Sequence, residues 1–314
     1  MFALSLRSAF DINLAAGQSR SLLTAWLVFH VVGGQVLLPI LFATFLFTRA
    51  VRHPVMVNMV ATWIVASTIA CLVFYGGEYY YDDPEQAAKA PLCKAQAAMM
   101  QHAVPPMLAT SSFALIYHVR STVRTTIVKD LPKAFQWLHT LRTAILVTLP
   151  YVTFAVFSLA GGISVMSRPN EVSLVRRELY CALEHSSMSI VSALFSALVL
   201  LATAYFEISI VLTLRRNSTG QREAGVEDSF QRALLIRVVI FGVYCIVGFV
   251  LSVVTVFVST PAPDLFIATV PVVVFIVFGC QGDVLTVWSF WRKFKTPSRP
   301  SIKGPRMKIE DDAA

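Results

Sequence analysis

Long apolar runs dominate the chain, and few polar residues interrupt them. A helix needs about 20 consecutive apolar residues to cross a bilayer, and these runs reach that length. Helices are expected because a backbone in lipid must satisfy its own hydrogen bonds, whereas barrels of the outer-membrane type are built from alternating segments of ~10 residues. The pattern predicts seven spans, at approximately residues 22–48, 55–77, 92–119, 141–166, 186–214, 233–258 and 265–291.

These spans predict an all-α integral membrane protein, a seven-transmembrane-helix bundle over residues 22–291, without an internal repeat. Residues 1–21 are interpreted as a short extracellular N-tail. Arg7 and Asp11 interrupt what would have to be the apolar core of a signal peptide there. Residues 292–314 are expected to form a short, disordered cytoplasmic tail.

The charges support the membrane interpretation and add an orientation. Only 14% of the residues are charged, against 56% hydrophobic, and the net charge is +8. The segments that would share a side with the C-terminus hold 18 Lys and Arg, and those on the other side hold 7. Because basic residues concentrate on the cytoplasmic side, the N-terminus is predicted outside and the C-terminus in the cytoplasm. The Asn217 sequon then falls on the cytoplasmic side and is expected to carry no glycan.

Two of the five cysteines, Cys93 and Cys181, lie at the predicted outer side of the membrane, which is the oxidising one. The other three lie inside spans, where cysteine is usually a small packing residue. We expect a disulfide between Cys93 and Cys181 that fixes the fourth-to-fifth connection on helix three. The alternative is a pair of unpaired thiols.

The third span contains polar side chains and two prolines beside Cys93. Polar residues inside spans often mark functional sites, and proline kinks a helix and frees carbonyl groups. Pro105 and Pro106 therefore predict a kink. The candidate residues for an outward-facing ligand pocket are Gln96, Met99, Met100, Gln101, His102, Glu184 and His185. Hydrogen bonding between helices is the equally weighted alternative for each polar one.

Three charged residues lie toward the inner ends of spans: Asp283, Glu207 and Arg237. A carboxylate at the depth of Asp283 needs a partner or a water-filled cavity, which favours a switch or packing role. Glu207 and Arg237 could reach the interface or form an ion pair that locks helices five and six together.

The sequence favours no enzyme. It has no HExxH, GxSxG or phosphate-loop motif, and its histidines are scattered over different spans, so neither a metal site nor a cofactor is expected. The last span also lacks the lysine that a retinal protein needs for its Schiff base.

Seven helices with an outer N-terminus, a cysteine at the top of helix three and another before helix five resemble a G-protein-coupled receptor. The text LCKAQAAMMQHAVPPMLATSSFALIYHVRSTV of helix three is similar to orphan receptors of basidiomycete fungi. The same holds for RALLIRVVIFGVYCIVGFVLSVV and VFGCQGDVLTVWSFWRKFK. Fungal pheromone receptors are near neighbours. The rhodopsin-like switch motifs are absent, since Tyr117-His118-Val119 replaces Asp/Glu-Arg-Tyr and the sixth span has no proline.

The resemblance implies a multi-pass plasma-membrane receptor that senses an extracellular small molecule, lipid or peptide and signals to a heterotrimeric G protein. The expected partners are thus the lipid bilayer, the ligand and a Gα subunit, with no nucleic acid. The residues expected to face Gα are Arg120, Arg124, Lys129, Arg215, Arg216, Arg222 and Arg232. A seven-helix transporter or channel is the alternative function, and a structural membrane protein without a ligand is a third.

Overall fold

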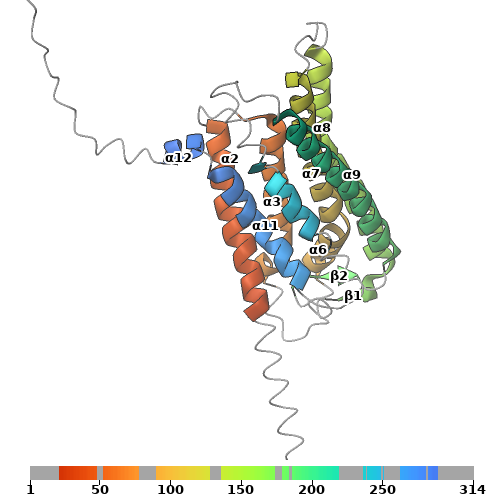
Figure 1. Cartoon of the computed structure of the whole chain (residues 1–314). Helices are drawn as coiled ribbons and strands as arrows, with labels where there is room; N and C mark the ends of the chain where they lie inside the picture. The colour runs from red at the N-terminus through yellow and green to blue at the C-terminus, as the bar shows by residue number, and fades with distance from the viewer. Residues whose placement is uncertain are drawn as a thin grey trace, which may run out of the picture.

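The computed structural model describes residues 21–47, 52–77, 90–127, 136–173, 179–183, 186–218, 236–237, 239–248, 250, 262–280 and 282–288. Helices make up nearly all of this part, and they pack lengthwise into one bundle (Figure 1). The elements are η1 (Phe29–Leu37), α2 (Leu38–Phe47), α3 (Pro54–Ala70), α4 (Leu72–Tyr75), α6 (Pro91–His102), α7 (Val104–Ile127), α8 (Gln136–Ser167), η4 (Pro169–Glu171), β1 (Val172–Ser173), β2 (Ala182–Leu183), α9 (Ser187–Ser218), α11 (Ala262–Gly279) and α12 (Gly282–Trp288). A further apolar helix covers Val239–Gly248.

Three helices are long and apolar enough to cross a membrane by length and composition: Ser21–Phe47, Thr140–Ser167 and Ser187–Thr213. Large apolar side chains are exposed along them, for example Leu159 (71% exposed) on α8 and Leu198 (67%) on α9. A soluble monomer rarely exposes such continuous apolar faces. The described helices therefore have the character of a membrane protein.

The helices begin where the sequence offers local start signals. Pro54 and Pro91 each occupy the first turn of α3 and α6, where the missing N–H of proline has no helical partner to lose. His53 also caps α3, because its Nδ1 accepts a hydrogen bond from the backbone N–H of Val55 at 3.4 Å.

The bundle has two distinct ends. At one end, β1 and β2 form a short antiparallel ladder with Val172 opposite Leu183, and Cys93 lies beside these strands. We name this end of the bundle the disulfide end. The other end holds Arg52, Arg120 and Arg142, and we name it the arginine end. Figure 1 shows β1 and β2 at the end of the bundle opposite α12.

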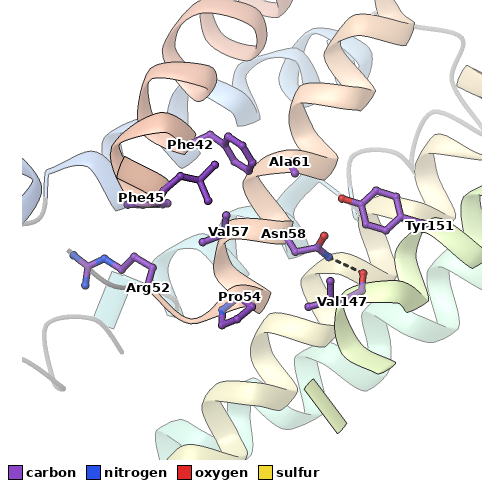
Figure 2. Close-up of a pocket in the computed structure, with 10 residues that line it drawn as sticks. Phe42, Phe45, Arg52, Pro54, Val57, Asn58, Ala61, Val147 and Tyr151 are labelled. Carbon is purple, nitrogen blue, oxygen red and sulfur yellow. Dashed lines mark hydrogen bonds between the residues drawn. The ribbon is translucent and has the colours of Figure 1, made fainter. Parts of the chain in front are cut away.

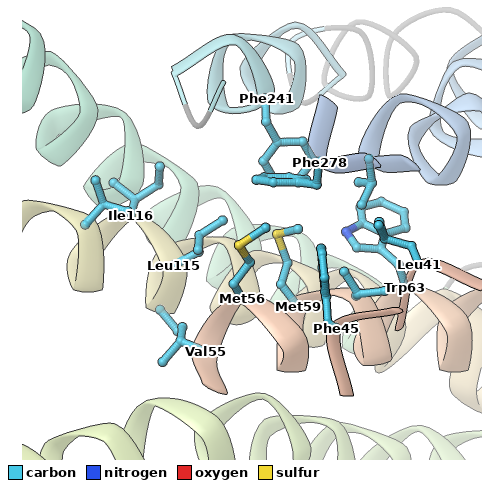
Figure 3. Close-up of a cluster of buried hydrophobic side chains, with 14 of the residues drawn as sticks. Leu41, Phe45, Val55, Met56, Met59, Trp63, Leu115, Ile116, Phe241 and Phe278 are labelled. Carbon is cyan, nitrogen blue, oxygen red and sulfur yellow. The ribbon is translucent and has the colours of Figure 1, made fainter. Parts of the chain in front are cut away.

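The largest hydrophobic cluster fills the half of the bundle nearer the arginine end. In this cluster, Met56 and Met59 of α3 lie between two groups of side chains (Figure 3). One group is Leu115 and Ile116 of α7, and the other is the rings of Phe241 and Phe278. The cluster also contains residues of α2, α8, α9, α11 and α12, so side chains from eight helices, the helix Val239–Gly248 included, meet in one core.

The predicted seventh helix is interrupted. Helix α11 ends at Gly279 and α12 begins at Gly282, so residues 265–291 do not form one continuous helix as the sequence analysis expected. Trp288 of α12 stacks on Phe275 of α11 with ring centroids 5.3 Å apart, and its Nε1 donates to Thr44 Oγ1 of α2 at 3.1 Å. The short helix α12 therefore contacts both α2 and α11.

Candidate functional site

The disulfide end is closed by a covalent bond between Cys93 of α6 and Cys181. Their Cα atoms are 5.4 Å apart, and both side chains are fully buried. The predicted disulfide is confirmed. The bond holds the segment 179–183 on the first turn of α6. This segment lies between α8, the fourth predicted helix, and α9, the fifth.

Gln96 and Gln101 bind the same segment through their side-chain amides. Gln96 Oε1 accepts from the backbone N–H of Cys181 at 3.1 Å, and its Nε2 donates to the carbonyl of Ala70 at 2.6 Å. Gln101 pairs with both backbone groups of Leu183, accepting from its N–H at 2.7 Å and donating to its carbonyl at 3.1 Å. The Gln101 side-chain amide therefore pairs with β2 as the backbone of a neighbouring strand would.

The same segment also reaches the first and last helices. Tyr180 stacks on Trp26, with centroids 6.1 Å apart, and its hydroxyl donates to Asp264 Oδ1 at 3.4 Å. Leu179, Tyr180 and Ala182 belong to one buried cluster with Trp26 and Ala268 of α11. Residues 179–183 thus extend from helix three across the end of the bundle.

Helix three is interrupted close to Pro105 and Pro106, where the sequence predicted a kink, but the interruption precedes the prolines. Helix α6 ends at His102 and α7 begins at Val104, so the break lies at Ala103 and both prolines belong to the first turn of α7. A regular helix would pair the N–H of residue 106 with the carbonyl of His102, and Pro106 has none. That carbonyl instead accepts a hydrogen bond from Ser192 Oγ of α9 at 2.8 Å.

The remaining pocket candidates fall into two groups. His102 is fully buried, and its Nε2 lies 3.1 Å from Ser186 Oγ while its Nδ1 lies 3.2 Å from the carbonyl of Ala97. Met99 and Met100 are partly buried against apolar clusters. Glu184 and His185 lie outside the described residues. The hydrogen bonds match the alternative of interhelical bonding; contact with a ligand stays a prediction.

Glu207 and Arg237 do not form the ion pair that the sequence suggested. Arg237 Nη2 donates to the carbonyl of Cys280 at 3.0 Å and so links the sixth helix to the end of α11. Glu207 is 3% exposed, and neither carboxyl oxygen has a hydrogen-bond partner among the described residues. The carboxyl group faces Gly242, where an added Cβ would lie 2.3 Å from its Oε1.

Asp283, the other predicted switch residue, lies in the first turn of α12. This helix begins after the interruption of the seventh helix, so the residue does not lie inside a continuous span. A carboxylate in a first turn interacts favourably with the helix dipole. The position of its side chain is outside the described part of the chain.

At the arginine end, the guanidinium groups lie on aromatic rings. Arg120 of α7 is 4.3 Å from the ring centroid of Phe206 on α9. Arg142 of α8 lies 4.6 Å from the ring of Tyr117 and hydrogen-bonds Ser121 of α7. Arg120, a predicted G-protein contact, therefore also joins helices three and five.

The other predicted G-protein contacts lie at or beyond the edge of the described residues. Arg124 and the pair Arg215 and Arg216 lie in the last turns of α7 and α9, where no side-chain position is described. Lys129, Arg222 and Arg232 fall outside the described residues.

Among the described residues, no group of three His, Cys, Asp or Glu side chains could hold a metal ion. No protein-family model matches the sequence, and no curated protein is similar to it at a significant level. The receptor resemblance therefore stays a prediction, and function has to be argued from the site.

Proposed function

We propose that the protein is a seven-span plasma-membrane receptor, with its disulfide end outside the cell, that signals through a heterotrimeric G protein. The carrying observation is the Cys93–Cys181 bond, which ties a connection between two helices across one end of the bundle. Disulfides persist in oxidising compartments, which supports an extracellular position for that end. The arginines at the opposite end support a cytoplasmic position there.

The helix positions support the seven spans. Described helices coincide with each stretch that the apolar runs predict, including the helix Val239–Gly248 within the predicted sixth span. The chain also crosses from one end of the bundle to the other in successive helices (Figure 1).

The contacts at the two ends support a receptor in which the cytoplasmic side moves. Receptor signalling requires two bundle states whose populations a ligand can shift. Helices three and five are joined near the disulfide end by the Ser192 hydrogen bond to the His102 carbonyl. Between helices five and six, Glu207 faces Gly242 without a hydrogen bond among the described residues. This pair of helices is the one that we propose separates on activation.

The covered disulfide end favours a small or lipid-like ligand over a peptide. Leu179, Tyr180 and Cys181 are buried between α6 and Trp26, so this segment occupies space that a bulky ligand would need. A small apolar molecule could instead pass between helices from the lipid. The ligand contacts would be those predicted along helix three.

The proposal can be tested without a ligand. Gly242→Leu would place a bulky side chain against the Glu207 carboxyl group and force helices five and six apart. We expect this variant to raise ligand-independent nucleotide exchange on a co-expressed fungal Gα. Val243→Leu is the matched control, because Val243 is 52% exposed on the outside of the same helix and its enlargement should leave exchange unchanged.

A transporter or channel would give a different result. Reconstituted protein would then mediate solute flux across vesicles, and no variant at Gly242 would raise exchange on any Gα. That combination would overturn the receptor proposal, whereas raised exchange in Gly242→Leu alone would support it.

A further inference from the structure

A groove separate from the sites above lies between α2, α3 and α8. Its cavity volume is about 460 Å³, within the range of small-molecule sites. Phe42 and Phe45 form one wall, Val57 and Ala61 of α3 form the floor, and Val147 of α8 forms the other wall (Figure 2).

The groove opens onto the lipid-facing surface rather than into the bundle. Leu46 and Tyr151, which both line it, are 52% and 39% exposed. The exposed residues that follow on α8, Val152 and Val156, are also apolar. An occupant would therefore enter from the membrane.

The polarity of the groove changes along its length. Arg52 lines its end at the arginine end of the bundle, directly before α3 begins at Pro54. Ala61 lies seven residues after Pro54 on α3, which corresponds to about 10 Å along the helix at 1.5 Å per residue. One leaflet of the hydrocarbon core is about 15 Å thick. If Arg52 lies at the membrane surface, a groove of this length reaches into one leaflet.

The walls are fixed by contacts that leave the groove open. Asn58 Nδ2 donates to the carbonyl of Val147 at 3.1 Å, which joins α3 to α8 along the floor (Figure 2). Arg52 lies 5.9 Å from the ring centroid of Phe45. A guanidinium carries five donors in a planar fork, so Arg52 can bind a phosphate in addition to its existing contacts.

We propose that this groove binds an anionic phospholipid, with its phosphate on Arg52 and one acyl chain between α2, α3 and α8. Arginine binds phosphate by paired, charge-assisted hydrogen bonds, and the aromatic and aliphatic walls suit an acyl chain. A neutral sterol or a zwitterionic lipid fits the walls but does not use the cation. Because the groove lies at the arginine end, the proposed orientation would place this lipid in the cytoplasmic leaflet. The binding itself does not rest on that orientation.

The test is lipid binding to the purified full-length chain, measured by native mass spectrometry with phosphatidylserine and phosphatidylcholine as probes. We expect one tightly held phosphatidylserine per chain. Arg52→Gln should lower its affinity about fivefold, the effect of one basic residue near an anionic surface, and leave phosphatidylcholine unaffected. Arg168→Gln, which removes a half-exposed cation at the other end of the bundle, should change neither.

A second variant tests the groove without altering its charge. Ala61→Phe should fill the floor and displace phosphatidylserine, whereas Val152→Phe on the neighbouring outer surface of α8 should not. Unchanged phosphatidylserine binding in Arg52→Gln would overturn the proposal. So would a sterol that binds equally well with and without Arg52 and is displaced only by Ala61→Phe. None of these measurements involves a G protein, so their outcome is independent of the receptor proposal.

Discussion

At the disulfide end, polar groups are paired and a covalent bond joins two segments. The segment 179–183 is held by Cys93, by both glutamines of α6 and by Trp26. At the arginine end, Arg120 and Arg142 lie on aromatic rings, and the Glu207 carboxyl group has no hydrogen-bond partner among the described residues. Hydrogen bonds and covalent bonds fix directions, whereas ring contacts tolerate sliding. We therefore expect that the rearrangement required by the proposed function would begin at the arginine end.

Breaking the disulfide should have the largest effect. Cys93→Ser or Cys181→Ser is expected to lower the free energy of unfolding by roughly 2–5 kcal/mol, because the connection loses its attachment to α6. Unfolding by SDS in mixed micelles, followed by tryptophan fluorescence, measures this loss. The double variant should be no less stable than either single one, and Cys280→Ser, at an exposed free cysteine, should match the parent. Additive losses would contradict the bond as the shared cause.

Two adjacent glycines of α8 test the packing of the disulfide end. A Cβ on Gly161 would lie 2.6 Å from the carbonyl of Ala98, whereas nothing lies within 4 Å of one on Gly162. Gly161→Ala should therefore destabilise the bundle by about 1–3 kcal/mol through overpacking. Gly162→Ala should stabilise it by up to about 1 kcal/mol through helix propensity. Equal effects in the same unfolding assay would show that helices three and four are not in close contact there.

Overpacking at Gly242, next to Glu207, should cost less stability than overpacking at Gly161. Gly242→Ala places a methyl group on a carboxyl group that ends a flexible side chain, so a loss of only about 1–2 kcal/mol is expected. Glu207→Ala should remove the clash, and the double variant should regain part of the stability. A double-mutant cycle measures this coupling, for which about 0.5–3 kcal/mol is typical of residues in contact. Strict additivity would mean that the two residues do not touch.

The bond between Ser192 and the His102 carbonyl should contribute about 1 kcal/mol, as hydrogen bonds between membrane helices do. Ser192→Ala should lose that amount. Ser196→Ala should lose less, since the Ser196 hydroxyl donates to the Ser192 carbonyl of its own helix. In a Pro106→Ala background the His102 carbonyl regains a helical N–H, so Ser192→Ala should cost little. A loss of the same size in both backgrounds would contradict this role.

The smallest effect is expected at the arginine end. Arg120→Gln removes the guanidinium from the ring of Phe206, a contact worth about 0.5–1 kcal/mol. Arg120→Lys keeps the charge and should lose less. If Arg120→Gln destabilised the bundle as much as Cys93→Ser does, the two ends would not differ in the way described above.

The sequence predicted features that depend on composition and compartment. The apolar runs locate the helices because hydrophobicity adds residue by residue, and Cys93 and Cys181 were the two cysteines at a span border or in a loop on the predicted outer side. Features that depend on helix rotation were not predictable. The sequence places Glu207 and Arg237 at similar depth, but rotation directs Arg237 to Cys280 and leaves Glu207 against Gly242.

The site shows the same division. The sequence identified Gln96, Gln101 and His102 as unusual. The two glutamines bind the backbone of a short segment that has no signal of its own except Cys181, and His102 hydrogen-bonds Ser186. Next to the break at Ala103, the His102 carbonyl is paired with Ser192 of α9. No local pattern links two residues 90 positions apart.

The spacing of the two bonded cysteines has a consequence for biosynthesis. Cys181 follows Cys93 by 88 residues, so the ribosome needs roughly 4–18 s between them at typical rates of synthesis. Throughout that interval the nascent chain carries Cys93 as a free thiol, and its two glutamine neighbours have no strand to bind. Yield in a host cell should therefore depend on its thiol oxidases and on translation speed between these two codons, as well as on membrane insertion.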